Sequence, residues 1–149
     1  DIENFRTEND CDRMVMVCAP SHRLARRSRV PLTELAAEKF IAFAADLPTR
    51  KALDRALRSA GVTMRPEREF DNIETVKRTV EIEGAVSILP ESALANERRA
   101  GSLIPVEIAS PHMWRPVGVV MKRNRAGSPA LRRFLELLRG ASFRPKLAK

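Results

Sequence analysis

The chain has 149 residues, of which 44% are hydrophobic and 31% are charged, and its formal net charge at pH 7 is +8. This composition is ordinary for a globular protein, and the sequence lacks the run of ~20 apolar residues that a membrane-spanning helix requires. The positive charge makes nucleic acid a candidate partner. Aromatic residues make up only 5%, however, and no zinc-finger spacing or RNA-binding aromatic stretch occurs. A basic module that binds nucleic acid directly is therefore the weaker alternative.

Predicted strands and helices alternate along the chain, with a basic loop at 20–29 and a helical turn at 32–35. Predicted strands cover 14–19, 39–44, 65–70, 86–89, 103–108 and 115–123, and predicted helices cover 48–60, 72–83, 91–99 and 128–138. The first strand is apolar throughout, as expected for a strand that is covered on both faces. This alternation is typical of an α/β fold with a largely parallel sheet.

The run 72–90, NIETVKRTVEIEGAVSILP, is the most informative segment. Asn72 is a predicted helix cap, and Val76 and Val80 lie on the apolar face of the helix that follows. Gly84 ends this helix, and a short buried strand comes next. In parallel α/β sheets, ligands bind where strands end and helices begin, because helix N-termini present unpaired N–H groups there.

The cysteines and the ends of the chain bear on its cellular context. Cys11 and Cys18 form no CxxC pair, and the two histidines are isolated from each other in sequence, so neither a metal nor a cofactor is predicted. Cys18 lies in an apolar run and is expected to be buried. The chain opens on Asp1 with no signal sequence in view, so we expect a processed or truncated piece of a cytoplasmic protein.

Catalysis finds little support. The sequence has no GxSxG, HExxH or P-loop pattern, and neither cysteine has a histidine partner in view. Asp71 and Glu74 are acids at a helix start, where acids act more simply as caps and dipole partners. The prediction is that the protein is not an enzyme.

Several segments, in order, resemble a LysR-type transcriptional regulator, in the C-terminal part of its effector-binding domain. These segments are MVMVCAPSHRLA, RVPLTELAAEKFIAF, the helix after Pro48-Thr49-Arg50, NIETVKRTVEIEGAVSILP, AGSLIPVEI and RPVGVVMKR. They extend over nearly the whole chain, from Met14 to Leu138. One departure is Ala85, which occupies the place where the family usually carries glycine directly before the strand.

The resemblance implies an α/β fold like the type II periplasmic binding proteins, with two lobes joined by crossing strands and a small effector in the cleft between them. Residues 1–20 would belong to the first lobe and a crossing strand, 21–106 to the second lobe, and 107–149 to the return to the first lobe, which would be incomplete. The family's N-terminal winged helix-turn-helix is not in this chain, so promoter DNA would be bound only through that missing part. A stand-alone solute-binding protein of the same fold is the other alternative.

The effector site is expected at two helix starts of the second lobe. Thr49 and Arg50 follow one strand and offer a hydroxyl, N–H groups and a cation, while a second group of residues follows the next strand. The predicted site residues are Thr49, Arg50, Phe70, Asp71, Asn72 and Ile73. Such a site suits a small carboxylate or another anion. Alternatively, Thr49 and Asn72 are plain helix caps and Arg50 points to solvent.

The resemblance also implies self-association to a dimer or tetramer. In the family, a helix of one lobe contacts a strand of the partner, and the helix 48–60 or the helix 128–138 could serve here. His22 belongs to the loop pattern and is expected to be structural.

Overall fold

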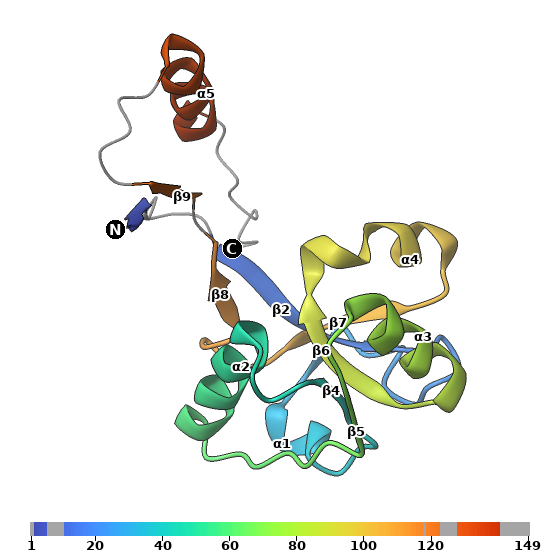
Figure 1. The fold of residues 1–149 in the computed structure, drawn as a ribbon. Helices are drawn as coiled ribbons and strands as arrows, with labels where there is room; N and C mark the ends of the chain where they lie inside the picture. Colours follow the sequence, from blue (N-terminus) through green and yellow to red (C-terminus); the bar gives the residue numbers. More distant parts are fainter. Residues whose placement is uncertain (1, 6–10, 118, 123–127, 141–149) are drawn as a thin grey trace. The chain divides into compact units, whose positions relative to one another are not determined.

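The structure is a computed structural model that describes residues 2–5, 11–117, 119–122 and 128–140 (Figure 1). It contains two compact units: Arg13–Arg115 forms the larger, and Asp1–Asp12 with Pro116–Lys149 forms the smaller. Among the helices in the described ranges, none has the length and apolar character needed to cross a membrane.

The main sheet of the larger unit is built around β2, the strand that the sequence predicts as its most apolar. β2 pairs antiparallel with β6 on one side and with β7 on the other, and β7 in turn pairs parallel with β3. β8 also pairs with β2. The strands are β2 (Cys11–Cys18), β3 (Arg29–Val30), β6 (Val86–Pro90), β7 (Ile104–Ile108) and β8 (Trp114–Pro116).

Both faces of β2 are covered, which explains its continuous apolar sequence. Met14, Met16 and Cys18 belong to one core, and Val15 and Val17 belong to a second core on the opposite face. All five side chains belong to residues that are at most 4% exposed. The predicted burial of Cys18 is therefore confirmed.

Two further parallel strands extend the larger unit. β4 (Ile41–Phe43) pairs with β5 (Arg68–Phe70), and a bridge from Phe40 to Val86 joins this pair to β6. Ala42 lies in the core that contains α2 (Pro48–Ser59). Its neighbours in β4 lie in the other core with α3 (Ile73–Glu83). The two helices therefore cover opposite faces of β4.

Both long helices of the larger unit form where the sequence predicts them. In α3, Asn72 Oδ1 accepts hydrogen bonds from the N–H groups of Glu74 (2.8 Å) and Thr75 (3.4 Å). Gly84 follows with φ of +63°, a left-handed conformation that costs glycine little, and it ends the helix. The predicted cap and stop are both confirmed.

Several elements differ from the sequence prediction, and the sheet around β2 is mainly antiparallel rather than largely parallel. The predicted helix 91–99 is a 3₁₀ turn, η1 (Glu91–Leu94), followed by α4 (Ala95–Ala100). The predicted strand 65–70 begins only at Arg68, because Pro66 has no N–H group to donate to a neighbouring strand. β3 lies at the end of a segment predicted as loop, since two residues carry too little pattern to indicate a strand. α1 (Leu32–Leu35) is the predicted helical turn.

The smaller unit contains β1 (Ile2–Phe5), which pairs antiparallel with β9 (Val119–Lys122), and α5 (Pro129–Gly140). The sequence predicts α5, but the strand predicted at 115–123 is divided into β8 and β9. Pro116 ends β8, as expected for a residue that cannot donate a ladder hydrogen bond. β1 was not predicted, because its four residues alternate poorly between apolar and polar.

Candidate functional site

The predicted site residues lie at one edge of the β4–β5 pair. The two strands are parallel and Phe43 lies opposite Phe70, so their carboxyl ends meet at the same edge. α2 begins after β4 and α3 begins after β5. The N–H group of Ala44 donates to the Phe70 carbonyl over 2.9 Å, which ties the two connecting loops together. The fold therefore brings both groups of predicted residues to one place.

The predicted residues at the end of β5 and in the turn after it have identifiable local roles. Asn72 is exposed, and its side-chain oxygen caps α3. This is the role as a helix cap that the sequence suggested as the alternative to an effector contact. Phe70 and Ile73 are half-buried and pack against the core that contains α3. Asp71 is exposed. Whether any of these residues contacts an effector stays a prediction.

The start of α2 differs from that of α3. Its N-cap position is held by Leu47 in an extended conformation, and within the described residues no side chain caps this N-terminus. Pro48 occupies the first helical position, which leaves half-buried Thr49 at the second. Thr49 is therefore not a helix cap, and that alternative is wrong. The first turn of α2 presents backbone donors without a side-chain acceptor from the described part of the chain.

Arg50 is buried, with 9% of the residue exposed. Its Nε donates to Asp54 Oδ1 over 2.9 Å, and its Nη1 donates to the Phe43 carbonyl over 2.6 Å and to Glu69 Oε1 over 2.8 Å. Burial alone would lower the pKa of Arg50, but the hydrogen bonds to Glu69 and Asp54 outweigh it and raise that pKa. The alternative that Arg50 points to solvent is wrong.

A second buried cation, which the sequence did not indicate, lies in α3. Lys77 Nζ lies 2.9 Å from Glu74 Oε1 and 3.1 Å from Glu97 Oε1, so it links α3 to α4. Burial alone would raise the pKa of Glu97, but a backbone hydrogen bond and the Lys77 ammonium more than offset it and lower that pKa. The contact with Glu74 was detectable from its helical spacing, whereas Glu97 is 20 residues away.

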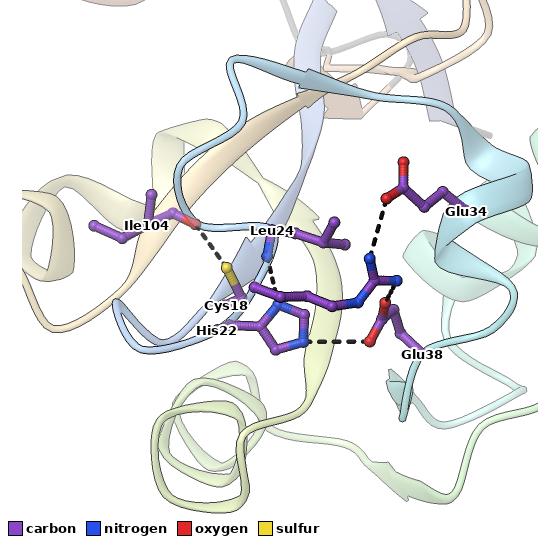
Figure 2. A network of polar contacts seen from close by, with 7 residues as sticks. Cys18, His22, Leu24, Glu34, Glu38 and Ile104 are labelled. Carbon is purple, nitrogen blue, oxygen red and sulfur yellow. Dashed lines mark hydrogen bonds and ion pairs between the residues drawn. The ribbon is translucent and has the colours of Figure 1, made fainter.

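Cys18 and His22 lie in a polar network beside α1 (Figure 2). His22 Nδ1 accepts from the Leu24 N–H over 3.2 Å, and its Nε2 lies 3.3 Å from Glu38 Oε2. Arg23 bridges Glu38 to Glu34 of α1. Burial, with a smaller contribution from Glu38, raises the pKa of Cys18 to about 11, so the thiol is protonated at neutral pH. The network therefore holds the loop to α1 and does not supply a nucleophilic thiolate.

A shallow hollow of about 420 Å³ lies on the outer face of α3. It runs between two rows of side chains spaced four residues apart, and Ile82 in one of these rows is 67% exposed. The hollow is lined by Glu74, Thr75, Arg78, Thr79, Ile82 and Glu83. None of the predicted effector residues lines it. A groove between such rows is the feature into which a second helix packs.

The class of protein follows from comparison with known families. The family model of the LysR substrate binding domain matches residues 11–142. The chain therefore belongs to the LysR substrate-binding domain family, as its sequence segments indicate.

Its relatives are transcriptional regulators. A probable RuBisCO transcriptional regulator of Cyanophora paradoxa is 30% identical over 128 residues, which are 84% of this chain and 40% of that protein. The transcriptional dual regulator GltC of Bacillus subtilis is 26% identical over 118 residues, 79% of this chain and 39% of that protein. The chain thus spans about 40% of the length of these curated relatives.

Solved structures show the same fold. The CcmR regulatory domain of Synechocystis PCC6803, in complex with 2-PG, superposes with a TM-score of 0.79 at 22% identity, covering 96% of this chain and 68% of that one. The effector-binding domain of QuiR, in complex with shikimate, gives 0.78 at 19% identity, covering 95% of this chain and 66% of that one. The predicted fold class is confirmed.

Proposed function

We propose that the chain is the effector-sensing part of a LysR-type regulator and binds a small anion at the shared edge of β4 and β5. One observation carries this proposal: the N-terminus of α2 lies at that edge without a side-chain cap from the described residues, while the N-terminus of α3 beside it is capped by Asn72. Free N–H groups and the helix dipole favour an anion there. The Thr49 hydroxyl would add a donor at the same turn.

The structural neighbours support a small effector. CcmR and QuiR share the fold, and each is a complex with a small molecule, 2-PG or shikimate. For this chain, Thr49 is the proposed direct contact, while Asp71 and Asn72 in the adjacent loop are the candidates for the second side of the ligand. Phe70 and Ile73 would form the apolar floor. No catalytic step is part of this function.

The effector contact is tested by titrating the intact protein with 2-PG, shikimate and inorganic phosphate in a calorimeter. For the probe that binds, Thr49→Val is expected to raise the Kd about tenfold, because a buried hydrogen bond to a charged ligand is lost. Thr63→Val, at an exposed position outside the edge, is the matched control and should leave the Kd unchanged. Equal affinities for the two variants, or no binding of any probe, would contradict the proposal.

For the whole protein, we propose a cytoplasmic regulator whose DNA-binding domain precedes this chain and alone contacts promoter DNA. The chain covers only about 40% of the length of each of these relatives, which supports this arrangement. An effector that prefers one conformation would then shift the population of the regulator on its promoter. The coding DNA upstream of the Asp1 codon decides the matter: an open frame encoding a helix-turn-helix supports a regulator, whereas a signal sequence there would indicate a stand-alone solute-binding protein.

The regulator is also proposed to self-associate, with the outer face of α3 as the contact surface. The hollow on α3 and the exposed Ile82 make this helix a stronger candidate than α2, which the sequence suggested. The sequence also suggested α5, which stays a second candidate because it exposes Phe134 and Leu137. Ile82→Glu should shift the intact protein toward monomer in light scattering, because a charge would be buried in the contact. Arg55→Glu places the same charge on α2 and should leave the mass unchanged. The opposite pattern would assign the contact to α2.

A further inference from the structure

Arg50 occupies a position that is electrostatically unfavourable in an isolated helix. It lies in the first turn of α2, where the helix dipole disfavours a cation, and this turn contains no acid. The pair that it forms with Asp54 has the cation on the N-terminal side, the weaker orientation for a helical pair. Local helix stability therefore does not explain an arginine at this position.

Its tertiary contacts do explain it. The guanidinium reaches three elements at once: Asp54 in α2, Glu69 in β5, and the carbonyl of Phe43 at the end of β4. A planar guanidinium presents donors in a fixed fork and can satisfy acceptors in several directions, which a lysine ammonium on a flexible stem does less well. Arg50 thus connects the first turn of α2 to both strands whose ends form the candidate site.

The same contacts make Arg50 a poor anion ligand. Asp54 and Glu69 place two carboxylates on one guanidinium, so the cluster offers an incoming anion no net positive charge. Thr49, the adjacent residue, belongs to the turn that Arg50 holds. Ala44, at the other end of the connecting loop, is held by the Phe70 carbonyl. Both ends of the loop 44–47 are therefore attached to the β4–β5 edge.

We infer that Arg50 is a positioning residue, which holds Thr49 and the first turn of α2 in the geometry that receives the effector, and is not itself an effector ligand. This inference rests on the proposed function. It replaces the direct cationic contact that the sequence suggested for Arg50. A second consequence is that Glu69, which the sequence did not single out, supports the site through Arg50.

The first experiment measures amide hydrogen exchange by NMR in the intact, ligand-free protein. In Arg50→Gln, the amides of Ala44 and Lys51 should exchange about tenfold faster than in the wild type, because the turn opens locally more often. Amides of β2 should not change. Arg55→Gln, an exposed cation one turn further along α2, is the matched control. Wild-type exchange at Ala44 and Lys51 in Arg50→Gln would overturn the inference, whether or not any effector is known.

The second experiment separates positioning from direct binding, with the probe that binds in the calorimeter. Arg50→Gln should weaken its Kd about tenfold, and Thr49→Val combined with Arg50→Gln should be no weaker than Thr49→Val alone, because the two changes remove the same contact. Additive losses would indicate a general structural effect and overturn the inference. Glu69→Ala should also weaken binding. Tighter binding in Glu69→Ala would mean that the released guanidinium is a ligand after all.

The two proposals fail in different ways. Faster exchange in Arg50→Gln with no effect of Thr49→Val on probe binding would retain the positioning role and reject the effector contact. Weaker binding in Thr49→Val with wild-type exchange in Arg50→Gln would do the reverse. Arg50→Lys guards against a variant that fails to fold: it keeps the charge but not the fork, and should give an intermediate exchange rate.

Discussion

The starts of α2 and α3 lie at the same edge of one pair of strands, yet they are built in opposite ways. α3 begins with an Asn72 cap and an acid in its first turn, so its local sequence satisfies its own N–H groups. α2 begins with Leu47 and a proline, without an acid, and carries a buried arginine instead. Departures from local helix rules tend to occur at functional sites, and this criterion supports the proposed effector contact at the start of α2.

Each of the two helices also carries one buried cation that pairs with two carboxylates, but the two cations contact different parts of the fold. Arg50 bonds to the strands at the edge, whereas Lys77 bonds to Glu97 of α4. A change at Arg50 should therefore alter the site, and a change at Lys77 should alter stability alone.

Lys77→Met should lower the free energy of unfolding by about 2–3 kcal/mol, because it leaves the partly buried Glu97 carboxylate without its partner. Lys51→Met, at an exposed position on α2, should change it by less than about 0.5 kcal/mol. Urea unfolding measures both values. A loss below about 0.5 kcal/mol in Lys77→Met would show that the pair contributes nothing.

The contribution of the Lys77–Glu97 pair should depend on pH in a defined direction. The pKa of Glu97 is lowered in the folded chain, so its stabilising effect is present above the ordinary carboxyl pKa of about 4.3 and is lost as pH falls through the lowered value. The pKa of Lys77 is raised, since its hydrogen bonds to Glu74 and Glu97 outweigh burial. Its effect is therefore lost as pH rises above about 10.4.

The difference in unfolding free energy between the wild type and Glu97→Gln should accordingly be largest between about pH 5 and 9. It should shrink steadily below about pH 4. Urea titrations at a series of pH values measure it. A difference that stays constant from pH 7 down to pH 3 would argue against an ionised pair.

Asn72→Ala should destabilise the chain by about 1 kcal/mol, since two N–H groups of α3 lose their acceptor. Asn72→Asp should retain most of the stability because aspartate also caps. Thr49→Ala is the counterpart on α2 and should cost less than about 0.5 kcal/mol, because Thr49 is not a cap. Equal losses at the two positions would remove the contrast between the helix starts.

Thr49→Asp should have a small effect on stability and an informative effect on binding. An acid in the uncapped first turn should stabilise α2 by about 0.3–1 kcal/mol through the helix dipole. The same charge should repel an anionic effector. A melting curve and a calorimetric titration test both effects. A stabilised variant with wild-type affinity for the anion would show that the anion does not bind at the start of α2.

Much of the fold could be predicted from the sequence wherever the determining contacts are short-range. The Asn72 cap and the Gly84 stop depend on residues within a few positions, so α3 was predicted correctly at both ends. The apolar run of β2 indicated burial on both faces, and its alternate residues do enter two cores. Where the pattern was short or interrupted by proline, as in β1, β3 and the division between β8 and β9, the prediction was wrong or missing.

The same distinction between short-range and long-range contacts applies to the candidate site. The sequence by itself determined where α2 and α3 begin and that both follow strands, because caps, proline and apolar spacing act over one or two turns. Only the tertiary structure decided that Arg50 bonds to Glu69 and that Lys77 bonds to Glu97, across 19 and 20 residues. Those contacts depend on how strands and helices pack against one another, which no local pattern encodes.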